Sequence, residues 1–473
     1  MGFLFFKNHK PKTVSFRLPF DFDMEVEEKV VFDERLFNDN KTYSKDLARL
    51  SFAFAVSSFS SNRARSDLSK SADNGIEFLS QCGFRKIRPT IDYSLPPTPY
   101  SLGAIFGKRK IKIGKRKLTL IAIGVRGGNY GAEWASNVTL GKKGPHEGFA
   151  LSKEKLYQDF ISYLLDYRIK GKIAIWVTGF SRAGGVANLF AGDILDESKE
   201  ERLTIHKASI DRDSVYAYCF ASPSTGEKEN QGYQGIFHTL NPNDAVPLIP
   251  PKEFGFSHYG EVIYLPDFYD EDINIKAREI LDRLGVGVPK KEFYMMKFDL
   301  LHMKDKERRC VVDAKAILVK QSEFLTRVRL ALTSGMDREG YYENVQDGLA
   351  SLLGLVDSSL ENPYIHIKNV LSSLFSSMFE EHNGISLLSK LLSKKFDMAS
   401  FLAPYAEKAL EEEKLDNIDK DKIALSLTYL AKASLPYLQK NTDLVATMIG
   451  GDNSSLILLA HTPALYWALL NQI

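Results

Sequence analysis

The sequence predicts an α/β fold in which helices cover both faces of a mostly parallel sheet. Two continuous apolar runs, at residues 118–125 (LTLIAIGV) and 173–178 (IAIWVT), are typical of strands buried on both faces. Other runs alternate with them along the chain: helical patterns over 152–169 and 182–195, and strand-like runs over 215–221 and 235–240. Alternation of strand and helix indicates a doubly wound sheet.

The chain has 473 residues, more than the roughly 100–200 of one ordinary domain. Its pattern of apolar and polar residues also changes along its length. We therefore expect four parts: an N-terminal extension packing on the core (1–99), the α/β core (100–267), a helical cap insertion (268–449) and a C-terminal return (450–473).

The two flanking regions differ in their expected secondary structure. The N-terminal extension is irregular, with strand-like pieces at 14–18 and 30–32, a helix starting near Ser44 and another over 72–82. After residue 267 helical periodicity dominates and strand-like runs nearly vanish. The clearest helical patterns there cover residues 323–332, 365–379, 385–392 and 423–438.

Composition narrows the class of protein. The 62 Lys and Arg residues nearly balance the 60 Asp and Glu residues, so a dedicated nucleic-acid binder is disfavoured. The three cysteines have no C-x-x-C spacing, which indicates neither a disulfide framework nor a zinc site. The N-terminal apolar run of four residues is shorter than a signal-peptide core of about 7–15 residues. With no transmembrane helix expected either, we predict a cytoplasmic protein, although export without a cleaved signal stays open.

One basic cluster interrupts this neutral balance. Seven Lys and Arg residues lie between Lys108 and Lys117, and the alternation KIKIGK predicts an exposed hairpin with Gly114 at the turn. The simpler interpretation is a solvated edge strand whose lysines prevent pairing with the strand of another chain. Transient contact of Lys108–Lys117 with anionic lipid headgroups is the alternative.

The segment IAIWVTGFSRAGGVANLFA, residues 173–191, indicates a catalytic serine. A buried strand ends in Gly179-Phe180-Ser181-Arg182-Ala183, and a helix rich in small residues follows at once. A nucleophile elbow requires this context, because its sharp turn brings the residues two before and two after the serine into near contact. The helix amino terminus then places the N–H of Arg182 beside an oxygen that becomes negative during acyl transfer. A tight turn with an incidental serine is the alternative.

A serine nucleophile also needs a base and an orienting acid, which follow it in the order Ser, Asp, His in this architecture. Asp244 lies in HTLNPNDAVP, just beyond a predicted strand, where ligands and catalytic groups gather at a parallel sheet. Its neighbours Asn241 and Asn243 are amides, so Asp244 is the only carboxylate of this turn. We favour Asp244 as the acid over an Asp that merely caps the turn.

Together, four motifs resemble the class 3 lipase family of α/β-hydrolases, particularly its bacterial lipase-like members. They are VRGGNYGAEWASN with HEGF, WVTGFSRAGGVANLFA, YAYCFASPSTG and HTLNPNDAVPLIPP, and they cover roughly residues 100–267 in the family's order. The resemblance implies that Ser181 is the nucleophile, that Asp244 is the acid, and that the N–H groups of Arg182 and Gly128 form the oxyanion hole.

The sequence departs from the family's pattern at three positions. The family usually has Ser or Thr where Gly128 stands, His where Phe180 stands and Gly where Ala183 stands. The departure at Gly128 leaves only its backbone N–H as the second donor. The departures at Gly128 and Phe180 also motivate an alternative function, a weak or inactive hydrolase fold that binds partners through its helical region.

The base is chosen among the histidines after Asp244. His461, in LILLAHTPALYWALL, resembles the His-x-Pro-x-x-Tyr ending of bacterial relatives, and a loop histidine before Pro463 could reach Ser181. His258 is the second candidate, although it resembles a family position that is not the base. The remaining three histidines lie in the helical region, where packing or surface roles are commoner: His302, His366 and His382. We predict His461.

The sequence therefore predicts a serine ester hydrolase of lipase or carboxylesterase type. Its expected catalytic triad is Ser181, Asp244 and His461, and its expected substrate is a small-molecule acyl ester or lipid. The predicted chemistry needs no metal or organic cofactor. A helical insertion between acid and base would fold over the carboxyl edge of the sheet and line an acyl pocket.

Overall fold

The computed structural model describes fifteen stretches of the chain. They are residues 11–21, 24–60, 70–96, 98–113, 116–127, 133–198, 202–227, 233–266, 271–283, 309–312, 315–318, 323–354, 404, 420–441 and 460–473. Gly128, the three histidines of the helical region and the helical patterns predicted over 365–379 and 385–392 lie outside these residues.

A central sheet organises the described residues, with strand order β12-β11-β10-β9-β8-β6-β5-β4-β3 and β7 paired with β8. All neighbours from β5 to β11 pair in parallel, whereas β3, β4, β7 and β12 pair antiparallel at the sheet's margins. The strands are β3 (Arg85–Pro89), β4 (Ala104–Ile113), β5 (Arg116–Val125), β6 (Gly171–Phe180), β7 (Arg202–Ile205), β8 (Ala208–Phe220), β9 (Ile236–Leu240), β10 (Glu261–Tyr264), β11 (Arg309–Val312) and β12 (Lys315–Leu318). The parallel core confirms the predicted α/β class.

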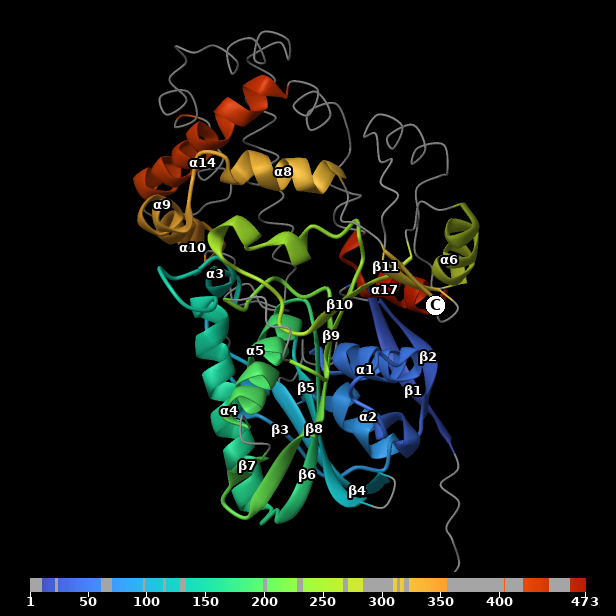
Figure 1. The fold of residues 1–473 in the computed structure, drawn as a ribbon. Helices are drawn as coiled ribbons and strands as arrows, with labels where there is room; N and C mark the ends of the chain where they lie inside the picture. The colour runs from blue at the N-terminus through green and yellow to red at the C-terminus, as the bar shows by residue number, and fades with distance from the viewer. Residues whose placement is uncertain are drawn as a thin grey trace, which may run out of the picture.

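Helices cover both faces of this sheet (Figure 1). On one face lie α4 (Glu147–Asp166) and α5 (Arg182–Glu197), which bury their apolar side chains against β5, β6 and β8. On the other lie α1 (Lys45–Ser57) and α2 (Asp73–Gln81), packed beneath the hairpin of β1 (Lys12–Asp21) and β2 (Met24–Phe32). The N-terminal extension thus shares a hydrophobic core with the sheet.

The C-terminal helix α17 (Pro463–Leu470) joins that second core. The side chains of Trp467 and Leu470 are almost fully buried. Phe16 of β1 meets Trp467 edge to face, with ring centroids 5.1 Å apart, and Phe52 of α1 stacks on it at 5.9 Å. The guanidinium group of Arg49 donates a hydrogen bond to the carbonyl oxygen of Leu470 at 3.2 Å. The last described helix is therefore held by the first elements of the chain.

Three local expectations differ from the structure. The helix expected to begin at Ser152 begins at Glu147, because the Ser152 hydroxyl donates to the carbonyl of Gly148 within the helix instead of capping it. The N-terminal extension is more regular than expected, since β1 and β2 form a hairpin. In the region expected to be helical, β11 and β12 extend the sheet.

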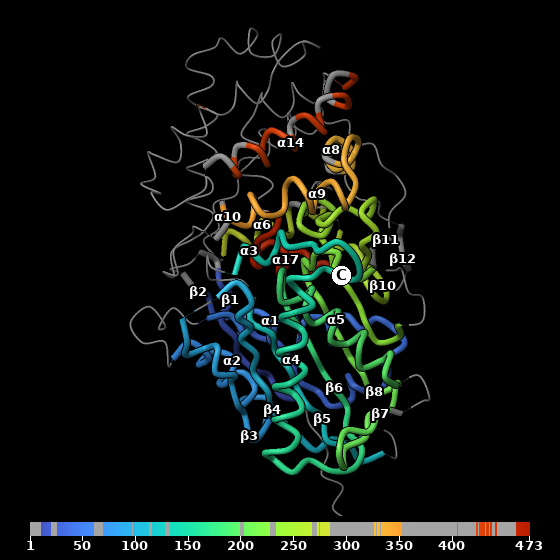
Figure 2. Tube along the Cα trace, turned by 90° about the vertical axis from the view of Figure 1, so that its left-hand side faces the viewer, coloured from blue at the N-terminus to red at the C-terminus, as the bar shows by residue number. Residues whose placement is uncertain are grey.

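Four helices of the predicted cap region lie beyond the carboxyl edge of the parallel strands, as Figures 1 and 2 show. They contact the core next to the short helix α3 (Trp134–Asn137) through an apolar cluster that includes Leu140, Phe256 and Tyr341. The four helices are α8 (Glu323–Thr333), α9 (Arg338–Asn344), α10 (Gln346–Gly354) and α14 (Lys420–Lys440). A further helix, α6 (Glu271–Arg283), packs against α17.

The basic cluster lies on the predicted hairpin, formed by β4 and β5. Arg109 pairs with Glu34 at 2.6 Å and Arg116 with Asp213 at 3.0 Å, so part of its charge is compensated. Arg116 and Lys117 begin β5, one strand length of about 30 Å from that strand's carboxyl end. Among the described helices, none combines the length and apolar character that crossing a membrane requires.

Candidate active site

Ser181 occupies a strained turn between β6 and α5. Its φ of 58° and ψ of −127° lie in a region that side-chain-bearing residues rarely adopt. The backbone is held there because the N–H of Ser181 donates to the carbonyl of Phe220 at 2.8 Å, and the N–H of Gly185 donates to the carbonyl of Ser181 at 3.2 Å. The half-buried serine side chain consequently stands at the carboxyl edge of the sheet.

Small residues make this turn feasible. A Cβ atom on Gly179 would lie 2.4 Å from the backbone carbonyl of Ala183, so only glycine fits at that position. A Cβ atom on Gly184 would lie 2.9 Å from the Cβ of Ser222. Ala183, where the family has glycine, is fully buried and tolerated because Gly179 supplies the missing space. The departure at Ala183 is thereby accounted for.

The structure brings Ser181, His461 and Asp244 together, although 280 residues separate the serine from the histidine. His461 Nδ1 lies 2.8 Å from Asp244 Oδ2, and His461 Nε2 lies 2.9 Å from Ser181 Oγ. Because an ionised carboxylate can only accept, the proton of the neutral imidazole is on Nδ1. Nε2 is then free to accept the proton of the serine hydroxyl, as a general base requires.

Asp244 is fully buried, and its carboxylate is fixed by several donors. Oδ1 accepts from the N–H of Val246 at 2.9 Å, and Oδ2 accepts from the hydroxyl of Tyr466 at 2.7 Å. The acid is therefore oriented toward the histidine by groups from both the Asp244 turn and helix α17.

Asn241 ties the turn that carries the acid to the loop that carries the base. Its side-chain Nδ2 donates to the carbonyl of Ala460 at 2.9 Å, and its backbone N–H donates to the hydroxyl of Tyr466 at 3.0 Å. Its Oδ1 accepts from the N–H of Asn243 at 3.1 Å. Sequence reasoning noted Asn241 only as a neutral neighbour and gave Tyr466 no role. The signal that could have found both is their position within the two motifs that supply the triad.

Phe180, where the family has histidine, lies against the catalytic rings. Its ring centroid is 5.4 Å from that of His461 and 5.3 Å from that of Tyr466, and its side chain is buried. The ring of Phe52, from α1, meets that of Phe180 edge to face at 6.1 Å. An apolar ring here gives the imidazole a packed support without offering it a competing hydrogen-bond partner.

His258, the second candidate for the base, does not contact Ser181. Its Nε2 lies 2.8 Å from the carbonyl of Ser222, and its ring packs 4.5 Å from that of His238. Desolvation lowers the pKa of His258 to about 4 and that of His238 well below its ordinary value. His238 is further fixed by Ser222 Oγ, 2.6 Å from its Nδ1. Two neutral, hydrogen-bonded histidines thus support the strands behind the elbow.

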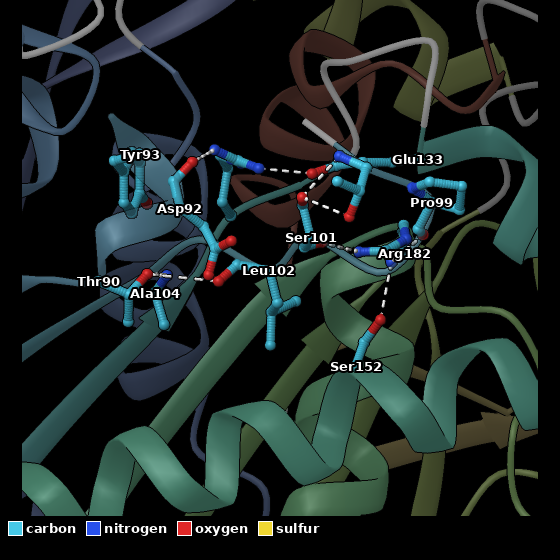
Figure 3. A network of polar contacts seen from close by, with 12 residues as sticks. Thr90, Asp92, Tyr93, Pro99, Ser101, Leu102, Ala104, Glu133, Ser152 and Arg182 are labelled. Atoms are coloured by element: carbon cyan, nitrogen blue, oxygen red, sulfur yellow. Dashed lines mark hydrogen bonds and ion pairs between the residues drawn. The ribbon is translucent and has the colours of Figure 1, made fainter. Parts of the chain in front are cut away.

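Arg182, the first residue of α5, has a backbone N–H in the helix's first turn, where such groups have no intrahelical partner. Arg182 as a whole is only 3% exposed, and Figure 3 shows its side chain among Pro99, Ser101 and Ser152. Nη2 donates to Ser152 Oγ at 2.8 Å, and Nη1 to the carbonyl of Ser101 at 3.4 Å. The other predicted oxyanion donor, Gly128, lies outside the described residues.

Fold and site together define an α/β-hydrolase with a Ser-His-Asp arrangement at the carboxyl edge of its sheet. Comparison with known proteins agrees with this class: residues 125–254 match the family model of lipase (class 3). This match, from the end of β5 past the acid-bearing turn, supports the resemblance seen in the motifs.

A curated relative is a lipase from Rhizomucor miehei, 28% identical over 141 residues. The aligned part covers 28% of this chain and 36% of that lipase. Two solved structures are also similar, each over less than half of this chain. A triacylglycerol lipase with a serine protease triad is 20% identical, with a TM-score of 0.33, over 48% of this chain and 82% of its own. Lipase II from Rhizopus niveus is 17% identical, with a TM-score of 0.30, over 46% of this chain and 80% of its own.

Proposed function

We propose that this protein is a serine hydrolase of carboxylic esters, of lipase type, with Ser181 as nucleophile, His461 as base and Asp244 as orienting acid. The observation that carries the proposal is the continuous hydrogen-bonded line from Ser181 Oγ through His461 to Asp244 Oδ2. It is supported by the family match, which includes both the elbow and the acid-bearing turn.

In the first half-reaction, Ser181 Oγ attacks the ester carbonyl while His461 Nε2 takes its proton. Asp244 stabilises the imidazolium that forms. The oxyanion of the tetrahedral intermediate is held by the N–H of Arg182 and, as the family resemblance implies, by the N–H of Gly128. The C–O bond to the leaving alcohol breaks as His461 returns the proton to that oxygen, which leaves an acyl-enzyme.

In the second half-reaction, water attacks the acyl-enzyme carbonyl. His461 accepts a proton from this water and returns it to Ser181 Oγ, so that the carboxylic acid leaves and the free enzyme is restored. The chemistry uses protein groups and water alone. A lipid ester is the proposed substrate class, because the matched family consists of lipases.

Substitution of Ser181 by alanine tests the proposal. We expect the wild type to hydrolyse p-nitrophenyl esters and to be labelled by a fluorophosphonate, and Ser181→Ala to do neither while keeping the wild-type melting temperature. His461→Ala should abolish labelling, whereas His258→Gln should preserve it. An unlabelled wild type would instead favour a hydrolase fold used for binding.

A series of acyl chain lengths identifies the ester class. If the cap region lines an acyl pocket, as the sequence predicts, kcat/KM should be higher for long-chain than for acetyl esters. We do not assign substrate delivery to Lys108–Lys117, because Lys112 and Lys117 pair at the end of β4 and β5 that is opposite the Ser181 end of the sheet. Lipid contact by this cluster stays a separate prediction, which charge-reversal variants and anionic vesicles can test.

A further inference from the structure

A short stretch of chain, residues 133–144, connects the cap region to the residue beside the nucleophile. We call this stretch the support segment; it contains α3 and the loop that follows it. At one end it contacts the buried guanidinium groups of Arg126 and Arg182. At the other end it is bound by the side chain of Arg338, from α9 of the cap region.

The contact with Arg182 bears on the oxyanion hole, because the same residue supplies the backbone N–H proposed to hold the oxyanion. Arg182 Nη2 donates to Ser136 Oγ at 3.2 Å, and Ser136 Oγ in turn donates to the carbonyl of Glu133 at 2.8 Å. Glu133 forms an ion pair with Arg126, and both side chains are almost fully buried. Displacing Ser136 would therefore disturb the anchoring of Arg182 directly.

The contact with Arg338 fixes the conformation of the loop in the support segment. Its guanidinium group donates to three backbone carbonyls: Nε to Gly141 at 2.8 Å, Nη1 to Gly144 at 2.9 Å and Nη2 to Leu140 at 3.0 Å. The same group lies over the ring of Phe256, 4.3 Å from its centroid. A planar fork of this kind recognises one arrangement of acceptors, which a lysine could not reproduce.

The loop depends on such external contacts. Gly141 and Gly144 have φ angles of +72° and +79°, and glycine has more conformational freedom to lose than other residues. Further hydrogen bonds from the cap region act on the same loop. The hydroxyl of Tyr341 donates to the carbonyl of Val138 at 2.9 Å, and Gln346 Oε1 accepts from the N–H of Gly141 at 3.0 Å.

We propose that Arg338 is a positioning residue for ester hydrolysis, which holds the support segment in the conformation that keeps the Arg182 N–H aimed at the oxyanion. This inference rests on the proposed function. It gives the cap region a role in the chemical step. Oxyanion contacts strengthen in the transition state, so a displaced donor lowers kcat more than it changes KM.

Hydrolysis of a p-nitrophenyl ester by Arg338→Ala and Arg338→Lys tests the proposal. We expect kcat to fall roughly ten- to a hundredfold in Arg338→Ala, the scale of a small misplacement within a catalytic site, with KM changing less. Arg338→Lys should lose part of this rate, because it keeps the charge but not the fork. The pH midpoint of kcat should not move, since His461 and Asp244 are untouched.

Glu339→Gln is the matched control. The substitution removes an exposed ion pair of 2.6 Å between Glu339, which like Arg338 lies on α9, and Lys142 of the support segment. The variant should retain the wild-type kcat. Fluorophosphonate labelling distinguishes a slower reaction of Ser181 from a smaller fraction of folded protein. Arg338→Ala should label more slowly but reach the same labelled fraction as the wild type.

A double-mutant cycle with Ser136→Ala identifies the route of the effect. If Arg338 acts through Ser136, the two losses in kcat should not multiply. Full kcat in Arg338→Ala, or losses that multiply independently, would overturn the positioning role while the proposed function stands. A wild type that neither labels nor hydrolyses esters would overturn the proposed function, and this inference with it.

Discussion

The hydroxyl of Tyr466 and the imidazole of His461 donate to the same carboxylate oxygen, Oδ2 of Asp244, at 2.7 and 2.8 Å. Burial and the nearby carboxylate keep the pKa of Tyr466 well above its ordinary value, so its hydroxyl stays a donor at every working pH. The hydroxyl also accepts from the N–H of Asn241. Acid, base and C-terminal helix therefore share one buried hydrogen-bond network.

Removing this hydroxyl should impair catalysis more than folding. Tyr466→Phe deprives a buried carboxylate of a donor, and hydrogen bonds to charged groups contribute roughly 1.5–3 kcal/mol. We expect kcat/KM for an ester to fall about tenfold or more. Tyr216→Phe, which removes another buried hydroxyl that donates to the carbonyl of Phe37, should leave kcat/KM unchanged. Equal activity of the two variants would refute a role for Tyr466 in the site.

Asn241 should matter through its side-chain amide. Asn241→Ala removes the donor to the carbonyl of Ala460, and a neutral hydrogen bond contributes about 1 kcal/mol. We expect roughly a fivefold loss in the rate of fluorophosphonate labelling, because the loop before His461 is less well held. Asn243→Ala keeps the backbone N–H that Asn241 accepts from, and it should label as the wild type does.

The buried histidines predict how stability depends on pH. Folding lowers the pKa of His258 to about 4, whereas the unfolded chain has the ordinary value near 6.5. Between these values the unfolded state binds more protons, so the free energy of unfolding rises with pH. The stabilisation is complete above pH 6.5 and is lost as the pH falls toward 4.

His258→Gln isolates this contribution. The melting temperature of the wild type should drop between pH 7 and pH 5, and the drop should be smaller in His258→Gln. A glutamine amide can still donate to the carbonyl of Ser222, the partner of His258 Nε2. Ester hydrolysis at pH 8 should persist, and its loss would reopen His258 as the base.

The N-terminal hairpin should stabilise the helix that follows the base. Phe16→Ala removes a ring that is 3% exposed and packed on Trp467, and such truncations cost about 3–5 kcal/mol. The urea midpoint of unfolding should fall accordingly. Val31→Ala, on the half-exposed face of β2, should change stability by less than about 0.5 kcal/mol. Equal midpoints for the two variants would contradict the packing role of the hairpin.

Much of the core could be predicted from the sequence, because its signals are local. Continuous apolar runs marked β5 and β6, and the elbow motif marked Ser181 together with the start of α5. Local patterns failed where contacts with residues distant in the sequence decide the structure. Serine is a residue type favoured at helix caps, but Ser152 lies within α4. Its hydroxyl accepts a hydrogen bond from the guanidinium group of Arg182.

The same reason explains which site residues were missed. No local pattern reveals that Asn241 meets Ala460, or that Arg338 binds the loop of the support segment, since about 200 residues separate each pair in sequence. The choice between His461 and His258 depended on a resemblance for this reason. Both are plausible by spacing, and only the tertiary arrangement places His461 beside Ser181.

The packing of α17 on the N-terminal hairpin has a consequence for how reactivity arises during folding. Ser181 is an ordinary, weakly nucleophilic hydroxyl until His461 reaches it. The helix that follows His461 is seated on Phe16 and Phe52, which belong to the first elements of the described chain. A partly folded molecule, in which the sheet has formed but α17 has not docked on β1 and α1, would therefore carry an unreactive Ser181. Hydrolytic capacity would require that α17 has docked on β1 and α1.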